Sequence, residues 1–270
     1  MKVAILGATG ETGTSILNAL LESTEPRYEI TALVRQSSLE KPEVLALKGK
    51  GINVALRMKS REYSMKEQVI NHVKKVKFPY TIVDIGYWYQ LMLPRLPSCR
   101  IDYALPITLG GIPGDGDTPC AFTDLPDVGR WVARIIADPR TLNKMVFAYN
   151  TVLTMNQAYD LLEEASGEKT VRNYISEAAV MEGVARAEAD CPSPDSFNYF
   201  EVVKYQYFNA LGIRGYNTPE YSHYLGYVDA TELYPDMKVA TPEAYCERLL
   251  SGKATMIYQR LMPAAQQGER

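Results

Sequence analysis

The residues with the clearest chemical potential lie near the start of the chain, where three glycines fall within GATGETG, residues 7–13. They follow a short apolar run at residues 2–6 and precede apolar residues at helical spacing. Glycines permit a tight turn and let backbone N–H groups approach a pyrophosphate, which a helix N-terminus also attracts. This setting predicts dinucleotide binding, with a purely structural turn as the alternative. The predicted contacts are Gly7, Ala8, Thr9, Gly10, Glu11, Thr12 and Gly13.

A cation follows the second apolar run, which covers residues 30–34 and is predicted to be a strand. Folds that bind NAD usually place an acid there to bond the ribose 2′-hydroxyl, whereas Arg35 suits a 2′-phosphate. Lys41, together with Ser37 and Ser38, could join the same phosphate. We therefore predict NADP(H) as the cofactor. The alternative for Arg35 is a solvated loop charge.

Lys66 lies near the beginning of a predicted amphipathic helix over residues 64–76. It precedes Val69 by three residues and Val73 by seven, so it shares the face of the apolar stripe. Burial lowers the pKa of a lysine, and such a group could protonate an oxygen during hydride transfer. Snorkelling from the first turn is the alternative. With Tyr63 it forms Y-x-x-K, one residue short of the Y-x-x-x-K dyad of short-chain dehydrogenases, and we do not interpret it as that dyad.

An aromatic cluster of Tyr87, Trp88 and Tyr89 follows the strand predicted at residues 80–85. Open α/β sheets bind ligands at the carboxyl ends of their strands, so Tyr87 and Trp88 are candidate substrate-binding residues. Packing in the core is the alternative. His72 lies among lysines and is expected to be a surface residue rather than a ligand or a base.

These residues require a scaffold that begins with the order βαβαβ, because apolar runs at residues 2–6, 30–34 and 52–56 alternate with helical patterns. The pattern then breaks, and no fourth strand separates residue 56 from the helix that carries Lys66. The sequence predicts an α/β fold with a Rossmann-like parallel sheet whose second half is abbreviated, and a smaller, mostly helical C-terminal substrate domain. We expect residues 1–106 and 122–150 to form the NAD(P)-binding region, and residues 107–121 and 151–270 the substrate-binding or lid region.

Composition restricts the partners. With a formal charge of −3 and a pI near 5.6 the 270-residue chain has no basic field for nucleic acid, and a small-molecule substrate is expected. The four cysteines are far apart, without C-x-x-C spacing, which indicates neither a metal site nor a disulfide framework. No stretch is long and apolar enough for a signal peptide or a membrane span, so we expect no membrane association and a cytoplasmic location. The sequence predicts no oligomeric state.

Several segments together resemble the NmrA-like and isoflavone-reductase-like branch of the atypical short-chain reductases: VAILGATGETG, TALVR, FPYTIVDIGYWYQ, DLPDVGRWVARIIADPRTLNK and NTPEYSHYLGYVDATELYPD. The resemblance implies an NADPH-dependent reductase of an aromatic or polyketide-like metabolite, often in secondary metabolism. Its catalytic lysine stands 13 residues before the proline of the PYT motif, and this position is Lys66, counted from Pro79.

Comparison with that family also suggests that roughly 50 to 80 residues are missing after residue 56, at ~30 residues or more per βαβ unit. The missing part would hold the nicotinamide end of the cofactor. The alternative hypothesis is therefore a non-catalytic, NADP-binding regulator like NmrA, or an inactive shortened member of the family.

Overall fold

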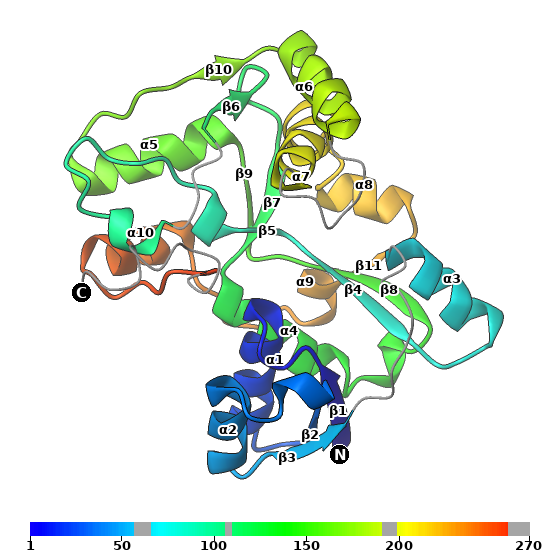
Figure 1. Ribbon diagram of the computed structural model, residues 1–270. Helices are drawn as coiled ribbons and strands as arrows, with labels where there is room; N and C mark the ends of the chain where they lie inside the picture. Colours follow the sequence, from blue (N-terminus) through cyan, green and yellow to red (C-terminus); the bar gives the residue numbers. More distant parts are fainter. Residues whose placement is uncertain (57–65, 106–109, 191–198, 259–270) are drawn as a thin grey trace. The chain divides into compact units, whose positions relative to one another are not determined.

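A computed structural model describes residues 1–56, 66–105, 110–190 and 199–258 of the chain (Figure 1). The chain divides into two compact units: unit 1 contains residues 1–84 and 125–148, and unit 2 contains residues 85–124 and 149–270. Unit 2 holds the larger share of the chain. The assignment of a cofactor role to one region and a substrate role to the other stays a prediction.

Unit 1 alternates strands and helices. Its elements are β1 (Lys2–Leu6), α1 (Glu11–Glu22), β2 (Glu29–Val34), α2 (Pro42–Gly49), β3 (Asn53–Leu56), α3 (Lys66–Lys75), β4 (Thr81–Ile85), α4 (Leu125–Ile135) and β8 (Lys144–Ala148). β1 pairs with β2, and β2 with β3, all in parallel, while β4 and β8 are neighbours in another sheet. The βαβαβ order predicted from the sequence is confirmed, because crossover helices place these strands in parallel.

One face of the β1–β2–β3 sheet is buried. Ile5 of β1 and Ile30 and Ala32 of β2 point to this face and pack with apolar residues of α1 and α2, including Leu17, Leu20 and Leu47. Alternation along a strand sends the intervening residues to the opposite face. Helices α1 and α2 therefore cover one face of the β1–β2–β3 sheet and form one layer of an α/β core with it.

The opposite face has much less cover. Ala4 is exposed, and Leu6 is 63% exposed although it lies in the first strand. Among the described strands, β1 pairs only with β2, so its other edge is open. Val76 lies just after the end of α3, within the helix predicted at residues 64–76, and it is 55% exposed. Parallel sheets are normally covered on both faces, so this face lacks part of its usual cover. The parallel pairing confirms the predicted fold class, a Rossmann-like sheet, and the incomplete cover agrees with its abbreviated second half.

Helices α1 and α4 are in very close contact (Figure 1). The Ser15 hydroxyl donates to the Leu125 carbonyl at 2.7 Å and accepts from the Gly129 N–H at 2.9 Å. A Cβ atom on Gly129 would lie 2.1 Å from the Ser15 carbonyl oxygen. Only glycine permits this approach, since two backbones meet there. Tyr28 adds a hydrogen bond to the Ala133 carbonyl at 2.8 Å.

Unit 2 is built from short strands and helices. Its elements are β5 (Tyr87–Trp88), β6 (Ile112–Pro113), β7 (Cys120–Thr123), β9 (Thr151–Leu153), α5 (Met155–Ser166), β10 (Tyr174–Ile175), α6 (Glu177–Ala189), α7 (Tyr199–Tyr207), a π-helix (Phe208–Ile213), α8 (Pro219–Tyr224), β11 (Val228–Asp229), α9 (Ala230–Leu233) and α10 (Pro242–Leu250). β5 and β9 flank β7, and β6 pairs with β10. The glycine- and proline-rich segment at residues 110–119 thus contains the two-residue strand β6, which pairs with the distant β10.

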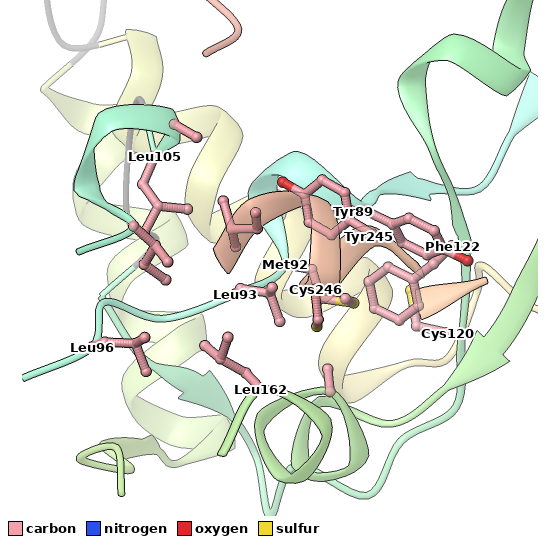
Figure 2. Close-up of a cluster of buried hydrophobic side chains, with 14 residues drawn as sticks. Tyr89, Met92, Leu93, Leu96, Leu105, Cys120, Phe122, Leu162, Tyr245 and Cys246 are labelled. Atoms are coloured by element: carbon pink, nitrogen blue, oxygen red, sulfur yellow. The ribbon is translucent and has the colours of Figure 1, made fainter. Parts of the chain in front are cut away.

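The core of unit 2 joins segments that are far apart in the sequence. Figure 2 shows Tyr89, Met92 and Phe122 packed with Tyr245 and Cys246 of α10. Beside them, the buried Asp124 carboxylate accepts hydrogen bonds from Gln90 Nε2 at 2.6 Å and Arg248 Nη2 at 2.7 Å. A buried carboxylate requires such partners, so these bonds fix α10 to the end of β7.

Local capping signals define the ends of α5. Thr154 and Gln157 form a capping box, and Gly167 ends the helix in the left-handed conformation. Near this end, the buried Glu163 carboxylate accepts from Lys169 Nζ at 2.7 Å and from the Thr170 hydroxyl at 2.6 Å and N–H at 3.1 Å. These bonds, first of all those from Lys169 and Thr170 side chains, lower the pKa of Glu163 from 4.5 to about 2.

Replacing Gly129 by alanine should destabilise the protein by about 1–3 kcal/mol, because the added methyl group has no space beside the Ser15 carbonyl. The measurement is the shift of the urea midpoint. Gly49→Ala is the matched control: a Cβ atom at Gly49 meets nothing within 4 Å, so this change should be neutral or slightly stabilising. Equal losses of stability in both variants would contradict the backbone contact.

The lowered pKa of Glu163 predicts that the stability of the protein depends on pH. Because its pKa is lower in the folded than in the unfolded chain, its contribution is complete above about pH 5 and is lost as the pH falls toward 2. Glu163→Gln should weaken this acid dependence of the unfolding free energy, measured by urea unfolding at several pH values. The exposed neighbour Glu164 provides the control, Glu164→Gln, which should leave the slope unchanged. An unchanged slope in Glu163→Gln would refute the assignment.

Candidate functional site

The glycine loop joins the end of β1 to the start of α1. Gly7 has φ +83°, in the left-handed region that suits glycine, and its carbonyl accepts from the Gly10 N–H at 2.9 Å. A Cβ atom on Gly13 would lie 2.0 Å from the Gly7 carbonyl oxygen, so only glycine lets α1 pack this tightly against the loop. A Cβ atom on Gly7 would meet nothing within 4 Å, which leaves open space above the loop.

The loop has the features of an anion site. Gly10 is the N-cap residue of α1 and supplies no side-chain hydrogen bond to the first turn. The N–H groups of a first helical turn have no partner within the helix and carry partial positive charge. Ala8 is buried, Thr9 is half-buried and Thr12 is exposed, while Glu11 adds one carboxylate in the first turn. The backbone thus fits a pyrophosphate, the group that the sequence predicts here.

Arg35 lies at the same edge of the sheet as the glycine loop. Leu6, the last residue of β1, is in register with Leu33 of β2, so Arg35 follows Val34 at the neighbouring strand end. Adjacent strands are ~4.8 Å apart, which brings the two strand ends together. Arg35 and Lys41 are both exposed and flank the 3-10 turn at residues 36–38, where Lys41 is the N-cap of α2. The register therefore places Arg35 at the strand end next to the glycine loop.

Lys66 is the first residue of α3, as its position in the predicted helix required. Its side chain, like those of residues 67–69, lies outside the described part of the structure, and so does Tyr63. His72 is exposed, which agrees with the expected surface position.

Tyr87 borders a narrow pocket within unit 2, with a volume of about 30 Å³. The lining is almost entirely apolar and includes Cys120 and Phe122 of β7 and Tyr207, Phe208 and Leu211 from the end of α7 and the π-helix. Tyr87 meets Phe122 and Tyr207 edge to face, with ring centroids 6.0 and 5.9 Å apart. The rings make the lining apolar, and the volume admits only a small group.

Burial keeps the Tyr87 phenol and the Cys120 thiol of this pocket neutral at physiological pH. Burial raises the pKa of the Tyr87 phenol, and burial also raises the pKa of the Cys120 thiol to about 11. The Cys120 sulfur accepts a hydrogen bond from Asn217 Nδ2 at 3.1 Å. The pocket can therefore bind an uncharged group, with the Tyr87 hydroxyl as a donor.

The three aromatic residues after β4 have different environments. Trp88 stacks on Tyr258 with ring centroids 6.1 Å apart, and Tyr89 is fully buried in the core of unit 2. Sequence reasoning did not identify Cys120, Phe122, Tyr207 or Phe208 as pocket residues. No motif marks them, because they come from segments about 85 residues apart that only tertiary packing brings together.

In the described part of the chain, no three His, Cys, Asp or Glu side chains are close enough to bind a metal ion. None of the described helices is both long and apolar enough to cross a bilayer. Cys120 and Cys246 are buried free thiols, and Cys99 is an exposed one.

The α/β fold and the glycine loop are typical of dinucleotide-binding proteins, and comparison with known proteins identifies the family. The sequence profile of the NmrA-like family matches residues 56–245. The chain is also 36% identical to asnovolin J 5′,6′-dehydrogenase of Aspergillus novofumigatus, over 93% of this chain and 96% of that protein. The chain belongs to the NmrA-like family, as its motifs predicted.

More distant relatives include the probable pinoresinol-lariciresinol reductase 3 of Arabidopsis thaliana, 27% identical over 70% of this chain and 58% of the relative. The chain thus spans less than two thirds of that relative's length. Among solved structures, the fold matches an isoflavone reductase with a TM-score of 0.68 at 19% identity, covering 92% of this chain and 98% of the other. It matches a leucoanthocyanidin reductase–NADPH complex from Vitis vinifera equally well, with a TM-score of 0.68 at 18% identity over 93% and 100% of the two chains.

The comparison with the Aspergillus protein also shows a difference in length. The alignment has 314 positions and covers 93% of this 270-residue chain, about 251 residues, so about 63 positions, the difference, place a residue of the relative opposite a gap. A family member with most of its length in common therefore contains a segment that this chain lacks. This agrees with the open edge of β1.

Proposed function

We propose that this protein is an NADPH-dependent oxidoreductase that reduces an aromatic or polyketide-like metabolite of secondary metabolism. One observation carries the proposal: the glycine loop at the N-terminus of α1 and Arg35 follow adjacent strand ends, in a chain that shares nearly its full length with a named dehydrogenase. The relatives named as reductases, one of them solved with NADPH, support the same activity.

In this proposal the residues of unit 1 hold the cofactor. The N–H groups of Gly7 to Gly13 and the N-terminus of α1 bind the pyrophosphate, and Arg35 and Lys41 meet the 2′-phosphate. NADPH, when bound, supplies a hydride. Lys66 holds a proton for the substrate, so that hydride and proton together reduce one double bond or cleave one benzylic C–O bond.

The residues of unit 2 select the substrate. Tyr87 and its neighbours offer apolar contact, and Tyr87 can donate one hydrogen bond to an uncharged oxygen. Trp88 is a further candidate for substrate contact. The alternative of a non-catalytic regulator or an inactive shortened member is less favoured, because the relatives are named as enzymes.

Cofactor preference tests the role of Arg35. We expect NADPH to bind at least tenfold more tightly than NADH, a gap of ~1.4 kcal/mol that a charge-assisted contact to phosphate can supply. Arg35→Ala should remove most of this preference, measured by titration of cofactor fluorescence. Arg27 is exposed and precedes β2, at the opposite end of the strand, so Arg27→Ala should keep the preference. Equal affinity of the unaltered protein for both cofactors would refute the assignment.

Turnover tests the role of Lys66. Lys66→Ala should lower kcat by roughly 10² to 10⁴, the usual scale for a positioned acid–base group, with little change in NADPH affinity. The assay is NADPH consumption with aromatic ketones, enones and benzylic ethers. Lys75→Ala, at the other end of the same helix, is the control. Turnover that is indifferent to Lys66→Ala contradicts its role. Absence of turnover with every substrate, while NADPH still binds, favours the non-catalytic alternative.

A further inference from the structure

Unit 2 contains a second and larger cavity, which the proposed reaction does not use. Its volume is about 430 Å³, within the usual range for small-molecule sites. One wall is the segment from Leu91 to Pro97, and Met155 and Tyr159 of α5 contribute another. Met155 also lines the pocket at Tyr87, whereas Met92 lines only the larger cavity. The two sites thus share one flexible side chain.

Two polar side chains in this lining can donate hydrogen bonds. Tyr159 is only 6% exposed and brings a hydroxyl group to the lining. Arg95 is half-exposed and bonds Asp102 through Nη1. A guanidinium has five N–H donors, so Arg95 can donate to a second acceptor while it bonds Asp102. The Tyr159 hydroxyl and the half-exposed Arg95 guanidinium can therefore both donate hydrogen bonds to an acceptor on a bound molecule.

The wall opposite the leucines is held in place. Glu163 fixes residues 169 and 170 through the hydrogen bonds described above. Asn173 Nδ2 donates to the Gly110 carbonyl at 3.1 Å, and the Asn173 carbonyl accepts from the Ile112 N–H at 2.8 Å. Pro94 and Pro97 restrict the other wall. The cavity is therefore formed by the fold itself and does not depend on a ligand to create it.

We propose that this cavity binds a planar, largely apolar molecule with one carboxylate group. The rings would contact Met92, Leu93 and Leu96, and the carboxylate would accept hydrogen bonds from Arg95 and Tyr159. Asp102 offsets the charge of Arg95, so recognition depends on directed N–H and O–H donors more than on net charge. The inference does not depend on the proposed reductase activity, because every contact lies within unit 2 and involves no cofactor.

The test uses 2-naphthoate and its uncharged analogue 2-naphthamide, with affinities measured by calorimetry on the whole chain without cofactor. We expect 2-naphthoate to bind more tightly than 2-naphthamide. Arg95→Gln should weaken 2-naphthoate roughly tenfold and leave 2-naphthamide unchanged, since only the charge-assisted bond is lost. The conservative Tyr159→Phe keeps the packing and should weaken 2-naphthoate about threefold or more. Arg100, which is paired with Glu168 and lies outside the cavity, provides the control Arg100→Gln.

Methyl NMR of the methionines locates the bound molecule. The Met92 and Met155 methyl signals should shift as 2-naphthoate is added, while that of Met181, exposed on α6, should not. A shift of Met155 without Met92 would place the ligand in the Tyr87 pocket and overturn the proposal. Unchanged affinity in both Arg95→Gln and Tyr159→Phe would overturn it as well.

Discussion

Two contacts between backbones determine how helix α1 is held, and the candidate cofactor site depends on both. At Gly13 the helix approaches the Gly7 carbonyl, and at Ser15, half a turn further on, it meets Gly129 of α4. Neither place has space for a methyl group. Because the helix is held against the loop on one side and against α4 on the other, its N-terminus and the N–H groups of its first turn keep a fixed direction.

The rest of unit 1 is less complete. The face covered by α1 and α2 has an ordinary core, but the other face leaves Ala4 and Leu6 exposed, and β1 has an open edge among the described strands. A doubly wound fold binds its dinucleotide where β1 separates two mononucleotide halves. This chain keeps the half that carries the glycine loop and Arg35, and it lacks a segment that its Aspergillus relative has. The proposed activity thus depends most on the residues of the shortened second half that bind the nicotinamide end of the cofactor.

Much of unit 1 could be predicted because its signals are local. Apolar runs ending at Gly7 and Arg35 mark strands, and Thr154 with Gln157 marks a helix start in unit 2; the family and fold class follow from such motifs and are confirmed. The site residues, including Lys66 and Lys41, stay predictions.

The parts that were missed depend on long-range packing. The two-residue strand β6 exists only because β10 pairs with it, some 60 residues later. The lining around Tyr87 combines β7 with the π-helix, and the hydrogen bonds of Glu163 depend on the turn after α5. Polarity and periodicity along the chain carry no information about such partners. The open edge of β1 was foreseeable in the same way as the strands, since the absence of an apolar run between residue 56 and the helix that carries Lys66 is itself a local signal.

The most direct test of the account is a crystal structure of the protein with NADP⁺. The account predicts the pyrophosphate on the N–H groups of the loop from Gly7 to Gly13, and the 2′-phosphate within hydrogen-bond distance, about 3 Å, of the Arg35 guanidinium. A cofactor bound elsewhere, or one whose 2′-phosphate lies in solvent away from Arg35, would contradict it.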